Sequence, residues 1–281
     1  MPKPKHPVFR AVWWGCNLLL AVAFFALAYT GAREFSVRRY LDGYSDAIVP
    51  NFLPTAQKVQ AILNWMREEP SRGIADNPDT LATRDPANTL NYAQLLKVCG
   101  TATNAFLNLA RASDLQVRRL LLLSSDSSAK HVVAEVLVNA RWVVVDPAYR
   151  VMMKDAQGRL LTRKELQDPA IFNQAVSAVP NYPREYSYER VAHIRLSRLH
   201  LQRLIGAIYP NWEEKLDWSL LLERESFLYL VFAAAASLFF LVFRQILGWY
   251  ADSMLRIPRF HFRENMIRAS IAFFSTPEIK E

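Results

Sequence analysis

Residues 131–147, HVVAEVLVNARWVVVDP, contain two valine-rich runs that are separated by Asn139 and Ala140. Runs of β-branched residues on either side of a two-residue break predict a β-hairpin, with strands at 131–138 and 141–146. Successive side chains of a strand point to opposite faces of the sheet. The register of the hairpin therefore decides which side chains lie together.

Two registers of this hairpin place His131 and Asp146 on the same face. If Asn139 and Ala140 form the loop, Asp146 faces Val133 and His131 is its diagonal neighbour. If the loop lies one residue earlier, at 138–139, His131 faces Asp146 directly. Either register brings the imidazole within reach of the carboxylate, whereas a three-residue loop would place them on opposite faces.

Cys99 stands near the expected start of a helix. Apolar residues recur after it at helical spacing, namely Ala102, Ala105, Phe106, Leu109 and Ala110. The N-terminus of a helix lowers the pKa of a thiol through its dipole and its free N–H groups. The only other cysteine, Cys16, lies in an apolar stretch. We therefore expect no internal disulfide, and Cys99 serves either packing or reactivity.

Cysteine, histidine and aspartate are the residue types that form a thiolate nucleophile, its base and a group that orients the base. The candidate catalytic residues are accordingly Cys99, His131 and Asp146. The five histidines of the chain are scattered, and no Cys/His cluster has the spacing of metal ligands. We expect neither a metal ion nor a cofactor.

Three short motifs together resemble the core of the transglutaminase-like superfamily of papain-like cysteine enzymes. They are CGTA at 99–102, HVVAEV at 131–136 and WVVVDP at 142–147. The resemblance is specific over 92–150 and weaker over about 45–91 and 151–200. It implies an α+β fold, in which the helix bearing the cysteine lies against an antiparallel sheet. It also implies Cys99 as nucleophile, His131 as general base and acid, and Asp146 as the orienting carboxylate.

Two apolar stretches are long enough to cross a membrane, which takes about 20 residues. Residues 11–32 contain no charge, and residues 227–249 contain a single charge, Arg244. A cleaved signal peptide, with Ala26-Leu27-Ala28 as its cleavage site, is the alternative for the first stretch. The expected domains are an N-terminus at 1–10, spans at 11–32 and 227–249, a domain at 33–226 with its core at about 45–200, and a tail at 250–281.

The distribution of basic residues predicts the orientation of these spans. Arginines are concentrated after the second span, at Arg244, Arg256, Arg259, Arg263 and Arg268, and positive loops stay in the cytoplasm. With two spans, both termini are then cytoplasmic and residues 33–226 face the outside. Together with the lack of paired cysteines, this fits a two-pass protein of a bacterial inner membrane with a periplasmic domain.

The net charge of +8 is concentrated at the membrane flanks. The first ten residues carry +3, the residues from 227 onward carry +2, and only +3 is left for the long middle region. This distribution argues against a nucleic-acid-binding protein. The expected partners are a protein or peptide substrate, membrane lipid and a membrane export complex.

The sequence thus predicts a membrane-tethered, transglutaminase-like cysteine enzyme that acts on amide or peptide bonds through a thioester. Hydrolysis by a protease or amidase and amine transfer by an acyltransferase share the first half of this reaction, and both stay open. The alternative is a non-catalytic papain-like module that serves as a binding or assembly part of a membrane or polymer-export complex.

Overall fold

The computed structural model describes residues 7–68, 86, 90, 99–124, 129–193, 209, 219–255 and 267. Its helices and strands, in chain order, are α1 (Pro7–Ile48), α2 (Thr55–Glu68), α5 (Cys99–Ala112), β1 (Val117–Leu123), β2 (Ala129–Val138), β3 (Arg141–Asp146), β4 (Val151–Met152), the short 3-10 helix η1 (Glu165–Gln167), α6 (Pro169–Val176), β5 (Val191–Ala192), α9 (Ser219–Glu223) and α10 (Glu225–Ser253). The chain forms two compact units, one of residues 29–231 and one of residues 1–28 and 232–281, and each is described by itself.

The larger unit is built on a five-stranded antiparallel sheet with the strand order β4-β3-β2-β1-β5. The hairpin β2–β3 turns at Asn139 and Ala140, which both have positive φ angles, 49° and 62°. Two such residues form a turn whose twist matches that of the strands. Ala134 pairs with Val145, so the first of the two predicted registers is present, with Val133 opposite Asp146.

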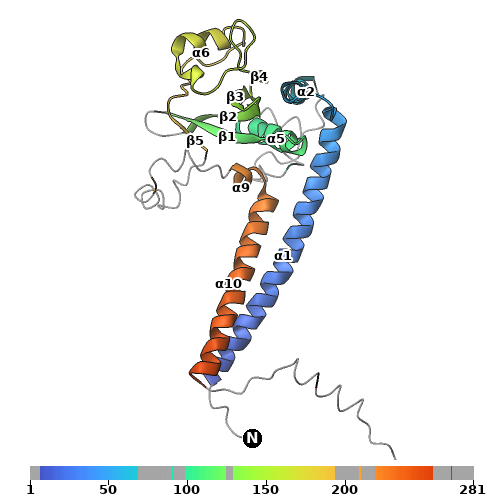
Figure 1. Ribbon diagram of the computed structural model, residues 1–281, viewed down its shortest axis with the longest axis vertical. Helices are drawn as coiled ribbons and strands as arrows, with labels where there is room; N and C mark the ends of the chain where they lie inside the picture. The colour runs from blue at the N-terminus through green and yellow to red at the C-terminus, as the bar shows by residue number, and fades with distance from the viewer. Residues whose placement is uncertain are drawn as a thin grey trace, which may run out of the picture. The chain divides into compact units, whose positions relative to one another are not determined.

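Both faces of the sheet are covered, as the near-continuous valine runs require. On one face, Ala134 and Val136 of β2 pack with the buried sides of α2 and α5. On the other face, Val133 and Val144 pack with α6 and with tyrosines that follow it in the chain. Figure 1 shows α5 and α6 on different sides of the strands. The fold is thus the predicted helix-plus-antiparallel-sheet arrangement.

The helix α1 does not end with the apolar run 11–32 but continues to Ile48. Its last turns carry an apolar stripe at helical spacing, in which Leu41 is buried in the core of the sheet domain and Val37 and Tyr44 pack against that core. The chain leaves the helical conformation just before Pro50, which disfavours helix in the residue that precedes it. The same helix therefore contains the apolar run and contributes side chains to the domain core.

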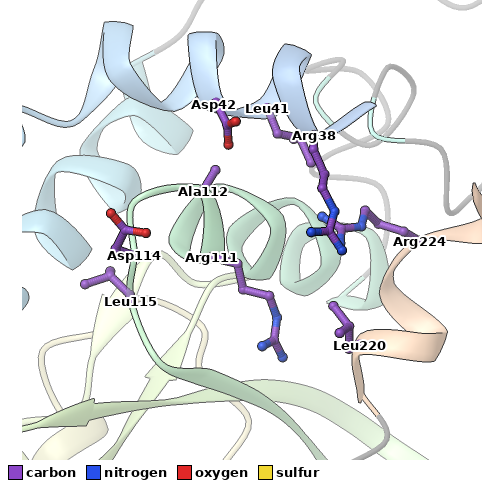
Figure 2. Close-up of a pocket in the computed structure, with 9 residues that line it drawn as sticks. All are labelled: Arg38, Leu41, Asp42, Arg111, Ala112, Asp114, Leu115, Leu220 and Arg224. Carbon is purple, nitrogen blue, oxygen red and sulfur yellow. The ribbon is translucent and has the colours of Figure 1, made fainter. Parts of the chain in front are cut away.

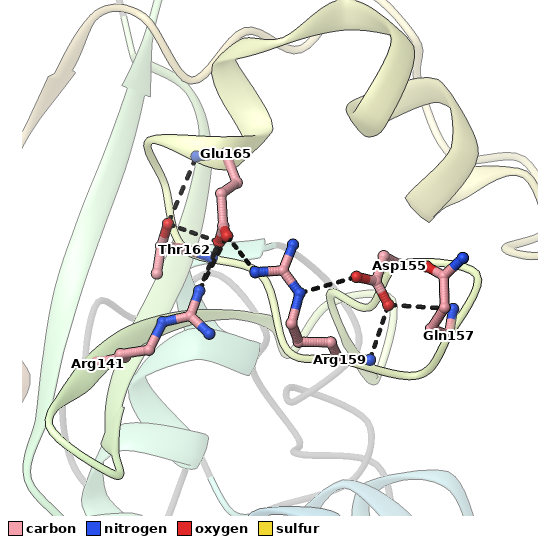
Figure 3. Close-up of polar contacts among 6 residues, drawn as sticks. All are labelled: Arg141, Asp155, Gln157, Arg159, Thr162 and Glu165. Atoms are coloured by element: carbon pink, nitrogen blue, oxygen red, sulfur yellow. Dashed lines mark hydrogen bonds and ion pairs between the residues drawn. The ribbon is translucent and has the colours of Figure 1, made fainter.

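A polar network on the surface of the domain fixes the connection that follows β4 (Figure 3). The carboxylate of Glu165 accepts hydrogen bonds from Arg141, from Arg159, and from both the backbone N–H and the hydroxyl of Thr162. Arg159 also pairs with Asp155 at 3.0 Å. The network joins β3 to the segment that leads into α6.

In the smaller unit, parts of α1 and α10 lie side by side. Arg244 donates to Asn17 Oδ1 at 2.9 Å and lies over the ring of Trp13. Both helices are long and apolar enough to cross a membrane. In the most apolar 18-residue stretch of each helix, only 11% of the residues of α1 and 17% of those of α10 are buried. This low burial is unlike that of the core helix of a soluble protein, so both are candidate membrane spans.

Candidate active site

Cys99 is the first residue of α5, as the sequence predicts. The N–H groups of the first helical turn have no partner within the helix, so this end is electropositive. The half-buried sulfur interacts with the imidazole of His131 and with the backbone N–H of Val132. The hydrogen bond to His131 outweighs the effect of burial, and the pKa of the Cys99 thiol is lowered.

The second turn of α5 is tied directly to the strand that carries the histidine. The hydroxyl of Thr103 donates to the carbonyl oxygen of Val132 at 2.9 Å. Val132 is the neighbour of His131, so this bond fixes the distance between the helix and the imidazole. Thr103 is fully buried, which protects the bond from water.

His131 lies at an irregular point of the sheet. Leu122 pairs with His131, but Leu123 pairs with Ala129, so Lys130 is the extra residue of a β-bulge. Bulges re-aim neighbouring side chains and are frequent next to active sites. The imidazole is 3% exposed.

The two nitrogens of His131 have different partners. Nε2 donates to Asp146 Oδ2 at 2.7 Å, which leaves Nδ1 for the sulfur of Cys99. Burial alone would lower the pKa of His131, but the hydrogen bonds to Asp146 and Cys99 outweigh it and raise the pKa to about 9. A lowered thiol pKa beside a raised imidazole pKa favours the thiolate–imidazolium pair.

Asp146 ends β3 and is completely buried. Its Oδ1 accepts the backbone N–H groups of Ala148 and Tyr149 at 3.1 and 3.3 Å. Its Oδ2 accepts from His131 and from the hydroxyl of Tyr182, the latter at 2.9 Å. Four donors therefore hold the carboxylate in one orientation toward the imidazole.

Sequence reasoning missed the tyrosines that surround this pair. The ring of Tyr186 stacks on the imidazole of His131, with 4.5 Å between centroids and 11° between planes. The ring of Tyr149 meets the imidazole edge-on at 5.9 Å. The segment NYPREYSYE, residues 181–189, contains three tyrosines in seven positions, and this density was the available signal.

The structure thus brings together the three predicted residues, Cys99, His131 and Asp146. Cys16 lies in the smaller unit, where its thiol contacts the carbonyl oxygen of Phe240. Within the described part of the chain, no group of three or more His, Cys, Asp or Glu side chains is placed to hold a metal ion. The arrangement can form a nucleophilic thiolate and can give and take one proton at the imidazole.

Comparison with protein families agrees with this fold. Residues 42–147 match the model of the transglutaminase-like superfamily. This segment is a transglutaminase-like domain. The match includes Cys99, His131 and Asp146 and ends one residue after the aspartate, so Tyr182 and Tyr186 lie beyond it. No curated protein and no solved structure gives a match.

The matched segment begins earlier than the motifs alone suggest. It starts at Asp42, within the last turns of α1, and includes α2. The superfamily typically includes cysteine-dependent enzymes and also has non-catalytic members. Membership therefore accounts for the fold, and the chemistry must be argued from the site.

Proposed function

We propose that this protein is a cysteine enzyme that cleaves amide or peptide bonds through a thioester on Cys99. One observation carries the proposal: the imidazole of His131 contacts the thiol at the start of α5 and donates to the buried Asp146 at 2.7 Å. A structural histidine needs only one such partner. The two partners here are of the two kinds that a general base requires.

In the first half of the reaction, the Cys99 thiolate attacks the carbonyl carbon of the substrate amide. The C–N bond then breaks, and the His131 imidazolium gives its proton to the leaving amine. The product is a thioester on Cys99 and a neutral imidazole. Asp146 accepts the Nε2–H throughout and does not take the proton itself.

In the second half, the neutral His131 takes a proton from the group that attacks the thioester. If water attacks, the products are a carboxylic acid and the free thiolate. If a primary amine attacks, the product is a new amide. The free N–H groups at the start of α5 lie next to the carbonyl that the thiolate attacks, where negative charge develops.

The proposed setting is an inner membrane, with α1 and α10 as two spans, both termini inside and the transglutaminase-like domain on the periplasmic side. The low burial of both apolar helices supports this setting, and the basic tail after Arg244 supports the orientation. The proposed partners are a protein or peptide of the cell envelope, membrane lipid and a membrane export complex.

Alkylation kinetics of the full chain test the catalytic proposal. Iodoacetamide at near-neutral pH should label Cys99 faster than it labels a free-cysteine peptide, whose thiol has a pKa of about 8.5. Cys16→Ser is the matched control and should retain the fast reaction, whereas Cys99→Ser should lose it. If Cys99 and the free peptide react at equal rates, the protein is instead a non-catalytic binding module.

A pair of reporter fusions tests the setting. A reporter that is active only outside the cytoplasm should be silent after Glu281 and active when fused near Ser187 in a truncated chain. An active reporter after Glu281 would overturn the two-span orientation and leave the catalytic proposal untouched.

A further inference from the structure

A second polar site lies in the larger unit, in a pocket of about 410 Å³ (Figure 2). Its lining comes from the end of α1, the end of α5, α9 and the residue that precedes α10. The lining residues are Arg38, Leu41, Asp42, Arg111, Ala112, Asp114, Leu115, Leu220 and Arg224. None of them belongs to the proposed active site.

One end of the pocket carries more positive than negative charge. Arg38 Nε and Arg224 Nη2 bind the same atom, Glu34 Oε1, at 2.8 and 2.9 Å. Two guanidinium groups thus share one carboxylate. Glu34 is 3% exposed, and its carboxylate also accepts a hydrogen bond from the Ser226 hydroxyl at 2.7 Å. Burial and this hydrogen bond therefore fix the carboxylate that the two guanidinium groups share.

At the positively charged end of the pocket, Arg224 is the residue that indicates a ligand. It is 6% exposed, and its Nε has no hydrogen-bond partner although it is buried. A buried donor without a partner costs about 1–3 kcal/mol, more for a charged group, and such donors are rare in native proteins. Arg224 also lines the pocket, where an anion would place an acceptor beside its guanidinium group.

Arg111 adds a third guanidinium to the pocket, but its charge is already matched. It makes a bidentate pair with the fully buried Glu223, at 2.8 and 3.1 Å, and a hydrogen bond to Ser219. This pair anchors α9 to α5. The excess positive charge therefore belongs to Arg38 and Arg224.

The other part of the lining is acidic. Figure 2 shows the carboxylates of Asp42 and Asp114 apart from the guanidinium groups of Arg38 and Arg224. Within the described ranges of the chain, no basic side chain pairs with either aspartate. The C-terminal end of α5, with its negative dipole, lies between them at Ala112. This side of the pocket favours a cation.

We propose that the pocket binds a phosphoester that also carries a primary ammonium, as in a phosphoethanolamine headgroup. The phosphate would lie against Arg38 and Arg224, and the ammonium against Asp42 and Asp114. The side chains of Leu41, Leu115 and Leu220 provide apolar walls for the methylene groups between them. A zwitterion matches both charges of the pocket, whereas a simple anion matches only one.

The position of the pocket in the sequence favours a phospholipid as the source of this headgroup. Arg38 stands six residues after the apolar run 11–32, or about 9 Å along the helix. Arg224 stands three residues before the run that starts at 227. In the proposed membrane setting, on which the lipid source rests, both lie near the headgroup layer that flanks the hydrocarbon core of about 30 Å.

Native mass spectrometry of the full chain in detergent tests the proposal with defined lipids. The probes are phosphatidylethanolamine and phosphatidylglycerol of equal chain length at equal concentration, with free phosphoethanolamine as competitor. We expect the ethanolamine lipid to bind several-fold better, because only it has the ammonium.

Matched variants near the end of α1 locate the binding. Asp42→Asn should weaken binding of the ethanolamine lipid about fivefold to tenfold relative to Asp46→Asn, an exposed aspartate outside the pocket. Arg38→Gln should weaken binding of both lipids relative to Arg39→Gln. Arg38 is the more exposed of the two arginines, and in Arg38→Gln the buried Glu34 keeps Arg224 as its partner.

The outcomes separate this proposal from the others. Equal binding of the two lipids, or no difference between Asp42→Asn and Asp46→Asn, would overturn the zwitterion site. If free phosphoethanolamine displaces the lipid at equal concentration, the acyl chains contribute nothing and the lipid source is wrong. The rate of Cys99 alkylation reports the proposed catalytic function independently and should be the same in all four variants.

Discussion

Asp146 and Glu165 are two well-bonded carboxylates of the same domain with different surroundings. Asp146 is fully buried, and its acceptors are filled by a histidine, a tyrosine and two backbone amides. The Glu165 side chain is 24% exposed, and its partners are two arginines and Thr162. Arginines stay charged at all relevant pH values, whereas an imidazole exchanges its proton. The nature of the partner, and not the number of hydrogen bonds, separates a catalytic candidate from a structural tie.

The replacement Asp146→Asn should have the largest effect. The amide keeps the shape but loses the charge that stabilises the imidazolium, and it favours the wrong tautomer. We expect turnover to fall by about 10²–10⁴-fold, as in other triads, with the fold retained. Turnover and melting temperature measured together check this. A stable variant with undiminished turnover would remove Asp146 from the mechanism.

The pH profile should distinguish the same two carboxylates. His131 must be protonated to release the amine, so wild-type turnover should fall as the pH rises through its pKa of about 9. In Asp146→Asn, the charge that raises the pKa of His131 is lost while burial still lowers that pKa. The alkaline limb of the turnover profile should therefore move to lower pH. Glu165→Gln should leave it in place. An unmoved limb in Asp146→Asn would show that Asp146 does not control the imidazole.

Stability should not follow the titration of His131 in a simple way. Forming the thiolate–imidazolium pair moves a proton from Cys99 to His131 and leaves the number of bound protons unchanged. By linkage, the pair therefore gives little pH dependence to the free energy of unfolding between about pH 6.5 and 9, where the unfolded chain also binds one proton, on the thiol. This is why the profile above is measured on turnover.

Tyr182→Phe should have an intermediate effect. It removes the hydroxyl that donates to Asp146 Oδ2 and leaves the aromatic packing intact. We expect kcat to fall about tenfold with KM unchanged, since one hydrogen bond to a charged group is worth about 1.5 kcal/mol. Tyr188→Phe is the matched control, because the one side-chain partner of its hydroxyl among the described residues is Tyr182, at 3.4 Å. Equal losses in both variants would indicate a packing effect.

Glu165→Gln should have the smallest effect, confined to stability. Losing a partly exposed ion-pair network costs about 1 kcal/mol, or about 2–4 °C in melting temperature for a domain of this size. Thermal unfolding at neutral pH measures this, and Cys99 alkylation should be unchanged. A large loss of alkylation would show that the network supports the active site.

The acid range sharpens the same comparison. Burial favours a higher pKa for Glu165, but the hydrogen bonds from Thr162 and the arginines prevail and lower the pKa to about 2. Its contribution to stability is therefore fully present above the ordinary pKa of 4.5 and is lost as the pH falls toward 2. Wild type should lose more stability than Glu165→Gln between these values.

The parts of this molecule that depend on local pattern could be predicted from the sequence. The hairpin, its two-residue turn and the helix that starts at Cys99 follow from valine runs and helical spacing, and the structure has all three. The meeting of His131 and Asp146 was expected for both registers with a two-residue loop. The structure was required to exclude the three-residue loop and to choose between these two registers.

Other parts depend on contacts between distant segments and could not be predicted. Tyr182 is 36 residues from Asp146, and nothing in its neighbourhood fixes its partner. The bulge at Lys130 arises from how β1 and β2 pair, which no single strand determines. The sequence contains the apolar stripe of α1 that includes Leu41. The expected span nevertheless ended at residue 32, because the run before this residue is more hydrophobic than the stripe after it.

The stack of Tyr186 on His131 makes the imidazole observable in the resting protein. An aromatic ring 4.5 Å away and nearly parallel adds its own local magnetic field at the carbon-bound protons of the imidazole. Their NMR signals should therefore be displaced upfield from those of histidines exposed to solvent. A titration followed on these signals would report when the imidazole gains or loses its proton, without any substrate and without altering a residue of the site.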